Sequence, residues 1–324
     1  ILCYYGLQQI NQSPRPGLKA IIDTLDKDNI TINELGFYIG PRINAAGRME
    51  SGNIAVELLI EKDLDKASGL AEKLNQLNIQ RRVLDKETTQ DALNQIKKFK
   101  NETSHTTVVC NPEWHKGVIG ITASKLIEIY YRPTIVFTAT DDFFVGSARS
   151  VIGFNIHDAI GKCEAHVEQY GGHKYAAGIK VKKSQYKEFK DKFEEVVSRT
   201  ISKEAATKKV TIEGEIQLEE ITPKFYRILK QFAPFGPSNK TPIFSANNLR
   251  DTGYAKVVGN DNAHLRFSLT QQNSPSIYSA IGFGLANKYP NILNKKLFNA
   301  VFTVDQNDWN GKQKLQLKVM DIKN

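Results

Sequence analysis

The chain has 324 residues, of which 40% are hydrophobic and 24% are charged, a composition typical of a protein with ordinary hydrophobic cores. The length predicts two or three domains. The sequence has no run of about eighteen apolar residues, so it predicts no transmembrane helix. Lysine and arginine outnumber aspartate and glutamate by 44 to 35, which gives a formal net charge of +9. This balance favours a polyanionic partner, although a basic surface without such a partner is the open alternative.

The cysteines and the first residues bear on the cellular setting. Cys3, Cys110 and Cys163 are widely spaced and form neither a disulfide framework nor a repeated zinc pair, so we expect a reducing, cytoplasmic environment. The sequence starts with Ile1 inside an apolar pattern, without a visible signal peptide. We therefore expect a fragment whose N-terminal part is missing.

Helices are predicted for the N-terminal part of the chain. Residues 1–50 have the pattern of short helices and loops, and Asn53 to Ile60 predicts another short helix. Asp63 is placed to cap a much longer helix that runs to about Phe99, because apolar residues recur there at three-and-four spacing. A helix of about 36 residues spans roughly 54 Å, which is typical of a spacer between two domains.

Strands and helices alternate from Thr106 onward. Strands are predicted at Thr107–Cys110, Thr134–Phe137, Phe143–Ala148 and Ala177–Val181. Helices are predicted at Gly117–Tyr131, Phe154–Glu168 and Ser184–Arg199, the last with Ser184 as its cap. This alternation indicates a compact α/β domain.

The C-terminal third has a mostly β pattern after a polar linker at residues 201–209. One helix is expected at Ile221–Phe232. Strands are predicted at Val210–Ile216, Leu249–Val258, His264–Leu269, Ser276–Phe283, Leu297–Asp305 and Lys314–Asp321. Five or six strands with one helix predict a small β-barrel such as an OB-fold.

The segment Gly171 to Gly178, with the sequence Gly-Gly-His-Lys-Tyr-Ala-Ala-Gly, is the first candidate site. Adjacent glycines permit a tight turn whose backbone N–H groups can hold an oxyanion, and His173 adds a donor that titrates near neutral pH. We expect a phosphate-binding loop here, and a plain structural turn is the alternative.

A second candidate, Gly146 to Ser150, follows a predicted strand. Ser147 and Ser150 can donate hydrogen bonds to phosphate oxygens, and Arg149 can make a planar two-pronged contact. The alternative is a polar turn whose arginine pairs with a surface carboxylate.

Two further segments have the same phosphate-binding character. His115 and Lys116 lie between a predicted strand and a helix whose N-terminus favours an anion, unless this is only a capping turn that Trp114 anchors. The block Gly40 to Arg48 combines small residues with two arginines six positions apart.

Together these segments resemble the RecJ family of single-strand-specific 5′-to-3′ DNA exonucleases, within the DHH phosphoesterase superfamily. Further matching segments are Tyr5-Gly6-Leu7, Pro16–Ala20, Pro234–Asn239 with Pro242 and Phe244, and Trp309-Asn310-Gly311 with Leu315-Gln316-Leu317. The resemblance covers almost the whole chain, and Gly171–Gly178 matches the signature of the DHH-associated domain. One departure is Pro237-Ser238, where the family has another residue and a glycine.

The resemblance implies roles for individual residues. Ser147 and Arg149 match the pair that holds the 5′-terminal phosphate. Gly171, Gly172 and His173 match a loop that meets the scissile phosphate. His173 would contact the transition state there and would not ligate a metal.

Other substrate contacts follow from the same resemblance. Arg42, Asn44 and Arg48 match a block near the narrow entrance that admits one strand and excludes duplex. Ser150 and His115 complete the expected substrate-binding set.

The resemblance also implies an arrangement of domains. We expect the end of a DHH domain and a helical gateway in residues 1–62, and a connecting helix in 63–103. A DHH-associated domain is expected in 104–200 and an OB domain for nucleic acid in 201–324.

The cofactors and partners are likewise implied by the family. Two Mn²⁺ or Mg²⁺ ions would bind to the DHH domain, and we expect no metal ligands on this chain, whose sequence has no suitable cluster of carboxylates and histidines. The fragment alone would then be inactive. The expected partners are single-stranded DNA with a 5′-phosphate, a single-strand-binding protein and a helicase, for a monomeric cytoplasmic protein used in DNA repair and recombination.

Two alternative functions stay open at this point. One is a nano-RNase or cyclic-dinucleotide phosphodiesterase, which shares the DHH-associated domain, but the long helix and the predicted barrel argue against it. The other is a non-catalytic module that binds single strands.

Overall fold

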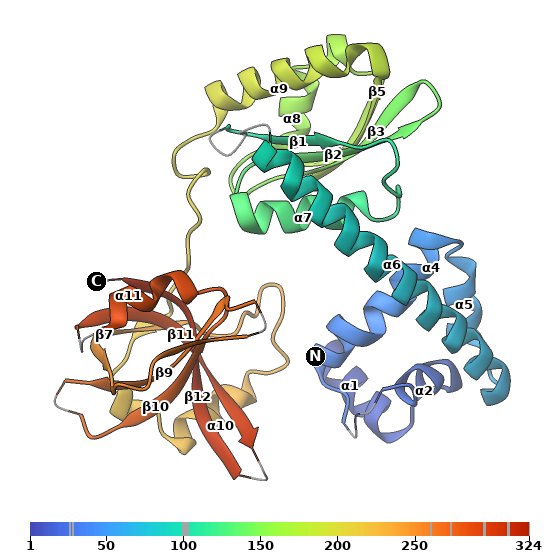
Figure 1. Cartoon of the computed structure of the whole chain (residues 1–324). Helices are drawn as coiled ribbons and strands as arrows, with labels where there is room; N and C mark the ends of the chain where they lie inside the picture. Colours follow the sequence, from blue (N-terminus) through green and yellow to red (C-terminus); the bar gives the residue numbers. More distant parts are fainter. Residues whose placement is uncertain are drawn as a thin grey trace. The chain divides into compact units, whose positions relative to one another are not determined.

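The structure is a computed structural model (Figure 1) that describes residues 1–25, 27, 29–98, 104–259, 261–272, 274–293, 296–309 and 312–323. It forms two compact units, residues 5–208 and residues 209–324 with 1–4. Each unit has its own hydrophobic core. None of the helices in these ranges combines the length and the apolarity that crossing a bilayer requires.

Short helices form the N-terminal part, as predicted. They are α1 Leu2–Gln12, α2 Pro16–Ile22, α3 Ile32–Glu34, the π-helix η1 Leu35–Ile39, α4 Gly40–Met49 and α5 Asn53–Ile60. Thr31 and Glu34 form a capping box at the start of α3. The apolar faces of α2, α4 and α5 pack against the first half of the long helix that follows α5 in the chain.

The predicted long helix is α6, Leu64–Lys98. The Asp63 Oδ1 atom accepts hydrogen bonds from the backbone N–H groups of Asp65 and Lys66 at 2.9 and 3.0 Å, so the predicted cap is confirmed. Its predicted end at Phe99 lies outside the described residues. Residues near its start join the N-terminal core and residues near its end join a core of the α/β part.

A five-stranded sheet forms the centre of the α/β part. Its strands are β1 Thr107–Cys110, β2 Thr134–Thr140, β3 Phe143–Arg149, β4 Gln169–His173 and β5 Ala176–Lys182. The order is β1-β2-β3-β5-β4, in which only the pair β1 and β2 is parallel. The predicted strands are confirmed.

Helices cover the two faces of this sheet unequally. On one face, α8 Ile156–Gly161 and α9 Tyr186–Thr200 pack on buried residues such as Phe137 (Figure 1). On the other, α7 Ile119–Tyr130 and the end of α6 cover Val109 and Val136, which lie on β1 and β2. On the β4 and β5 side of that second face His173 and Gly178 are exposed, and the candidate site lies next to it, between β3 and the start of α7.

Two predictions in this part are wrong in their details. The helix expected over Phe154–Glu168 ends at Gly161, a poor helix former, and a 3₁₀ turn at Glu164–His166 leads into β4. Ser184 does not cap α9. It lies in a 3₁₀ turn, and Gln185 precedes the helix without a capping hydrogen bond from its side chain.

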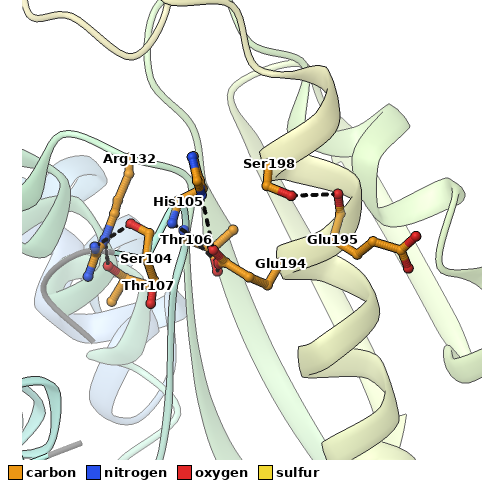
Figure 2. Close-up of polar contacts among 8 residues, drawn as sticks. All are labelled: Ser104, His105, Thr106, Thr107, Arg132, Glu194, Glu195 and Ser198. Atoms are coloured by element: carbon orange, nitrogen blue, oxygen red, sulfur yellow. Dashed lines mark hydrogen bonds and ion pairs between the residues drawn. The ribbon is translucent and has the colours of Figure 1, made fainter. Parts of the chain in front are cut away.

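Glu194 of α9 fixes the start of β1 (Figure 2). Its carboxylate accepts backbone hydrogen bonds from His105 at 2.7 Å and Thr106 at 2.9 Å, and another from the Thr106 hydroxyl. Nearby, the buried Arg132 donates from Nε to Thr107 Oγ1 at 2.7 Å. These contacts hold the edge strand in place and have a structural role.

The C-terminal unit is a closed circuit of strands. They are β6 Gly214–Glu215, β7 Phe244–Asp251, β8 Lys256–Val258, β9 His264–Gln271, β10 Ile277–Gly282, β11 Phe298–Trp309 and β12 Lys312–Lys323. The pairings run β7-β11-β12-β10-β9 and return from β9 to β7. The circuit therefore closes as the predicted OB-fold requires.

The details of this unit differ from the prediction in three places. Residues Val210–Ile216 contribute only the short β6. The strand expected over Leu249–Val258 is split, because Asp251 Oδ2 accepts from the Gly253 N–H at 2.6 Å and holds a turn there. The predicted helix is α10, Pro223–Gln231, and a short helix α11, Tyr289–Ile292, was not predicted.

Candidate phosphate-binding site

The end of β3 carries two of the predicted phosphate ligands. Arg149 Nη1 donates hydrogen bonds to Ser147 Oγ at 3.0 Å and to the Ala148 carbonyl oxygen at 2.8 Å. Burial lowers the pKa of Arg149, and the nearby charge of Arg48 lowers it further. Within the described ranges no carboxylate forms a salt bridge with Arg149, so the interpretation as a surface ion pair is wrong. A partly buried guanidinium near a second one is suited to binding an anion.

Helix α7 begins against this pair because Gly120 has no side chain. A β-carbon on Gly120 would lie 2.9 Å from Ser147 Oγ and 3.0 Å from Arg149 Nη2. Val118, the N-cap, offers no side-chain hydrogen bond to the first turn. The Ile121 N–H already donates to the Val118 carbonyl oxygen at 2.9 Å, so the N–H groups of Ile119 and Gly120 are the ones that can bind an anion that Ser147 and Arg149 hold.

A pocket of about 630 Å³ opens at this place. Arg48 of α4 reaches it, and its Nη1 donates to the Gly117 carbonyl oxygen at 3.3 Å. His115 Nδ1 accepts from the Gly117 N–H at 3.0 Å, which leaves Nε2 as the donor of the neutral ring. The lining residues are Gly47, Arg48, Met49, Glu50, His115, Lys116, Gly117, Ile119, Gly120, Val145, Gly146, Ser147 and Arg149.

His173 lies on the same face of the sheet as Arg149 but outside the pocket lining. In the strand register, Ala176 of β5 lies between Arg149 and His173. Gly178 of β5 lies in the same way between Ser147 and Gly171. Two strand spacings put β4 roughly 10 Å from β3. The residues of β5 between them, Ala176 and Gly178, are small, and His173 is exposed.

The Gly171–His173 segment is a strand and not the expected free loop. It forms β4 at the sheet edge, and a two-residue turn at Lys174 and Tyr175 joins it to β5. Gly172 has φ +141°, and a β-carbon there would lie 2.4 Å from the Ala176 carbonyl oxygen. Pairing with β5 therefore decides the conformation of this segment.

Other predicted site residues are placed elsewhere. Ser150 Oγ donates to the Phe154 carbonyl oxygen at 2.9 Å, so its side chain stabilises a turn. Arg42 Nε donates to Asn75 Oδ1 of α6 at 3.2 Å. Asn44 is exposed. None of the three lines the pocket.

Sequence reasoning missed Gly120 and Glu50. Gly120 is a glycine in the first turn of a helix, and such a residue is a signal of close approach by another group. Glu50 lines the pocket and pairs with Lys73 of α6 at 2.7 Å, a contact that depends on the packing of α4 against α6. Trp114 is 7% exposed and anchors the loop before α7, as the alternative interpretation of a capping turn expects.

A second pocket, of about 660 Å³, lies on the C-terminal unit. Its members combine cations with an aromatic ring, Phe283, that is 62% exposed and contacts His264 edge-on at 5.3 Å. The lining residues are Arg266, Ser279, Ile281, Phe283, Asn307, Lys314, Gln316 and Lys318. Cations beside an exposed ring are typical of a surface that binds single strands.

The described residues contain no group of three or more His, Cys, Asp or Glu side chains that could hold a metal ion. The polar side chains that line the pocket are cationic or neutral, apart from the carboxylate of Glu50. That carboxylate forms a salt bridge with Lys73. These residues fit a phosphate and do not fit a pair of divalent cations.

Family models match both the α/β part and the β part of the chain. The DHHA1 domain matches residues 101–199, and the RecJ OB domain matches residues 212–321. The predicted domain limits at 62, 103 and 200 are finer than these matches and stay predictions. The matching segment Trp309-Asn310-Gly311 extends outside the described residues at 310 and 311.

The chain is similar along nearly its whole length to two curated exonucleases named single-stranded-DNA-specific exonuclease RecJ. It is 29% identical to the Bacillus subtilis protein over 327 residues, which are 99% of this chain and 41% of that protein. With the Escherichia coli protein the identity is 28% over 336 residues, 99% of this chain and 57% of that one. The chain thus spans about half the length of these relatives.

Solved structures agree with this similarity. RecJ from Thermus thermophilus in complex with Mn²⁺ matches with a TM-score of 0.85 at 25% identity, over 100% of this chain and 46% of that chain. The Mg²⁺ complex of the same protein matches with a TM-score of 0.82 at 24% identity, over 98% and 48%.

Proposed function

We propose that the chain belongs to the RecJ family, which both domain models and the curated relatives support, and that the complete protein is a single-stranded-DNA-specific 5′-to-3′ exonuclease. This chain would supply the parts that bind the terminal phosphate and the strand. The observation that carries the proposal is the pocket in which Ser147, Arg149, Arg48 and the start of α7 converge.

The pocket distinguishes a terminal phosphate from an internal one by charge. A terminal phosphomonoester carries close to two negative charges at neutral pH and three acceptor oxygens. An internal diester carries one charge. Arg149 and Arg48 match the higher charge, Ser147 Oγ supplies a neutral donor, and the N–H groups of α7 complete the set. A strand with a 5′-phosphate should therefore bind more tightly than one without.

We propose that His173, with Gly171 and Gly172, contacts the scissile phosphate at the edge strand of the sheet. The exposed His173 shares a face with Arg149, so one strand end can reach both. Divalent Mn²⁺ or Mg²⁺ ions bound outside the described residues would activate the attacking water. The residues of this chain would then hold the terminal phosphate and donate hydrogen bonds to oxygen atoms of the scissile phosphate.

The remaining predicted contacts are proposed in narrower roles. His115 would donate from Nε2 to the phosphate in the pocket, and Ser150 would position the end of β3 through its bond to Phe154. Arg42 and Asn44, which both lie on α4, would contact the DNA strand. The ring of Phe283, in the pocket of the C-terminal unit, would stack on bases of the DNA strand. A single-strand-binding protein, a helicase, a monomeric state and a cytoplasmic location stay predictions.

The test is the affinity of this chain for matched oligonucleotides with a 5′-phosphate or a 5′-hydroxyl, for wild type and Arg149→Ala. A charged hydrogen bond is worth about 1.5–3 kcal/mol, so the variant should lose about 10- to 150-fold for the phosphorylated strand and little for the hydroxyl strand. Arg199→Ala, an exposed arginine of α9 that pairs with Glu195, is the matched control. Equal losses for both strands would contradict the assignment.

A further inference from the structure

The lining of the phosphate pocket contains a carboxylate. Among the described residues that line it, Glu50 alone is acidic, whereas Arg48, Lys116 and Arg149 carry positive charge. A negative charge repels a bound phosphate. Glu50 therefore opposes the ligand that the rest of the pocket favours.

Close packing fixes the backbone of Glu50 at the edge of the pocket. Glu50 is the C-cap of α4, and its backbone N–H donates to the Ala46 carbonyl oxygen at 2.9 Å. Two positions earlier, the backbone of Arg48 packs directly on Gly117, where an added β-carbon would lie 2.0 Å from the Arg48 carbonyl oxygen. The Arg48 side chain donates to the Gly117 carbonyl oxygen as well. The end of α4 is thus held against the loop before α7.

Lys73 of α6 orients the carboxylate of Glu50. Its Nζ atom lies 2.7 Å from Glu50 Oε1. In the part of the chain that the structure describes, Glu50 Oε2 has no hydrogen-bond partner. The side chains of Glu50 and Lys73 are 50% and 46% exposed, and ion pairs of this kind contribute little to stability. The carboxylate therefore stays accessible to a ligand in the pocket.

The position of Glu50 is also unfavourable for helix α4. The C-terminal end of a helix carries a partial negative charge, which favours cations and disfavours a carboxylate. Glu50 directly follows the last residue of α4, Met49. A residue that breaks a local rule inside a binding pocket is typical of a functional position. A role in selectivity accounts for a charge that favours neither the helix nor the binding of a phosphate.

We infer that Glu50 restricts the pocket to 5′-monophosphate ends by repelling the additional charge of a 5′-diphosphate or 5′-triphosphate. This role rests on the proposed function, because it requires a terminal phosphate held by Ser147 and Arg149. A pocket of about 630 Å³ is large enough for a chain of phosphates, so its volume does not exclude one. A phosphate chain that fills the pocket brings its further negative charge close to Glu50. Free nucleoside triphosphates are rejected in the same way, so they do not compete with strand ends.

The test measures the affinity of the full chain for one oligothymidylate with a 5′-hydroxyl, a 5′-monophosphate or a 5′-triphosphate at low salt. Wild type should bind the monophosphate strand most tightly. Glu50→Gln keeps the shape of the side chain and removes its charge. It should strengthen the binding of the triphosphate strand about 5- to 20-fold and that of the monophosphate strand by about threefold at most. Both gains should shrink at high salt, because the carboxylate is partly exposed.

Two further variants separate selectivity from a structural role. Lys73→Met removes the cation that offsets Glu50, so it should weaken the binding of the triphosphate strand, which is the opposite of Glu50→Gln. A salt bridge that only supports the fold would give changes of the same sign in both variants. Glu72→Gln is the matched control, because it removes an exposed carboxylate next to Lys73 on α6 and outside the pocket lining. It should bind all three strands as wild type does.

The outcomes distinguish this role from the proposed function. If wild type binds the monophosphate and hydroxyl strands equally, the phosphate pocket itself is wrong. The pocket stands and the role of Glu50 is overturned if wild type prefers the triphosphate strand, or if Glu50→Gln changes triphosphate and monophosphate binding by the same factor. A gain that is larger for the triphosphate strand, reversed in Lys73→Met and absent in Glu72→Gln supports the role of Glu50.

Discussion

The indole nitrogen of Trp114 donates a hydrogen bond to Asp91 Oδ2 at 3.0 Å and joins the loop before α7 to the long helix α6. The same oxygen accepts from Asn111 Nδ2 at 2.8 Å. His115, which lines the phosphate pocket, follows Trp114 directly. One carboxylate of the connecting helix thus fixes both ends of the segment that leads to the pocket.

We expect Asp91→Ala to destabilise the chain. It would leave the buried Trp114 N–H and the Asn111 amide without their acceptor, at a cost of about 1–3 kcal/mol. Chemical denaturation of the variant measures this free energy of unfolding. In a Trp114→Phe background the loss should be smaller, and an equal loss in both backgrounds would show that the Trp114 bond has no part in it.

Gly120→Ala should separate stability from phosphate binding. Alanine favours a helix over glycine by up to about 1 kcal/mol, but the methyl group would enter the space of Ser147 Oγ and Arg149 Nη2. The preference for phosphorylated strands should fall at least tenfold while the melting temperature changes little. Gly69→Ala on α6, where nothing lies within 4 Å of the added carbon, is the control and should leave binding unchanged. Unaltered phosphate preference in Gly120→Ala would count against the pocket.

Phe283→Ala should weaken the binding of long single strands. Stacking on one aromatic ring is worth about 1–3 kcal/mol per base, which corresponds to about 5- to 150-fold in affinity. The ring is 62% exposed, so its removal should cost little stability. Phe232→Ala, a similarly exposed ring of the same unit outside that pocket, should bind as wild type, and equal behaviour of the two variants would contradict the assignment.

The three cysteines should differ in reactivity. Burial raises the pKa of Cys110 to about 12 and that of Cys163 to about 11, so both stay protonated at pH 8, whereas Cys3 is exposed. Because the thiolate is the nucleophile, a thiol reagent should modify Cys3 quickly and the other two only after unfolding. Rapid modification that persists in Cys3→Ser would contradict this.

Ser238→Gly should stabilise the C-terminal unit. Ser238 has φ +64°, in the left-handed region that favours glycine. The left-handed conformation costs an L-residue about 1–2 kcal/mol, and the greater freedom of unfolded glycine offsets about 0.5–1 kcal/mol of the gain. A gain of about 0.5–1 kcal/mol in the free energy of unfolding is expected. Ser238→Ala, which cannot relieve the strain, should show no gain.

Local patterns were sufficient to predict most of the elements. The apolar run Thr107–Cys110 predicts β1 correctly, and Asp63 with the spacing after it predicts α6. Segments that depend on distant partners were less predictable. Gly171–His173 has a turn-like composition, yet pairing with β5 makes it a strand, because cross-strand contacts override intrinsic preference.

The candidate site was predicted as separate pieces. The spacing of Ser147 and Arg149 on one strand indicated a shared ligand, and the structure joins the two side chains. The contact of Arg48 with the Gly117 carbonyl spans 69 positions and follows from the packing of α4 on α6, which no local pattern contains.

The most direct test of the central claim is the affinity ratio of the wild-type chain for one short oligonucleotide with a 5′-phosphate and with a 5′-hydroxyl, measured between pH 5 and 7.5 at fixed salt. The phosphomonoester gains its second charge near pH 6, while the arginines stay protonated throughout. We predict a ratio above tenfold at pH 7.5 that falls as the pH drops through about 6. A ratio near one at every pH would contradict the account.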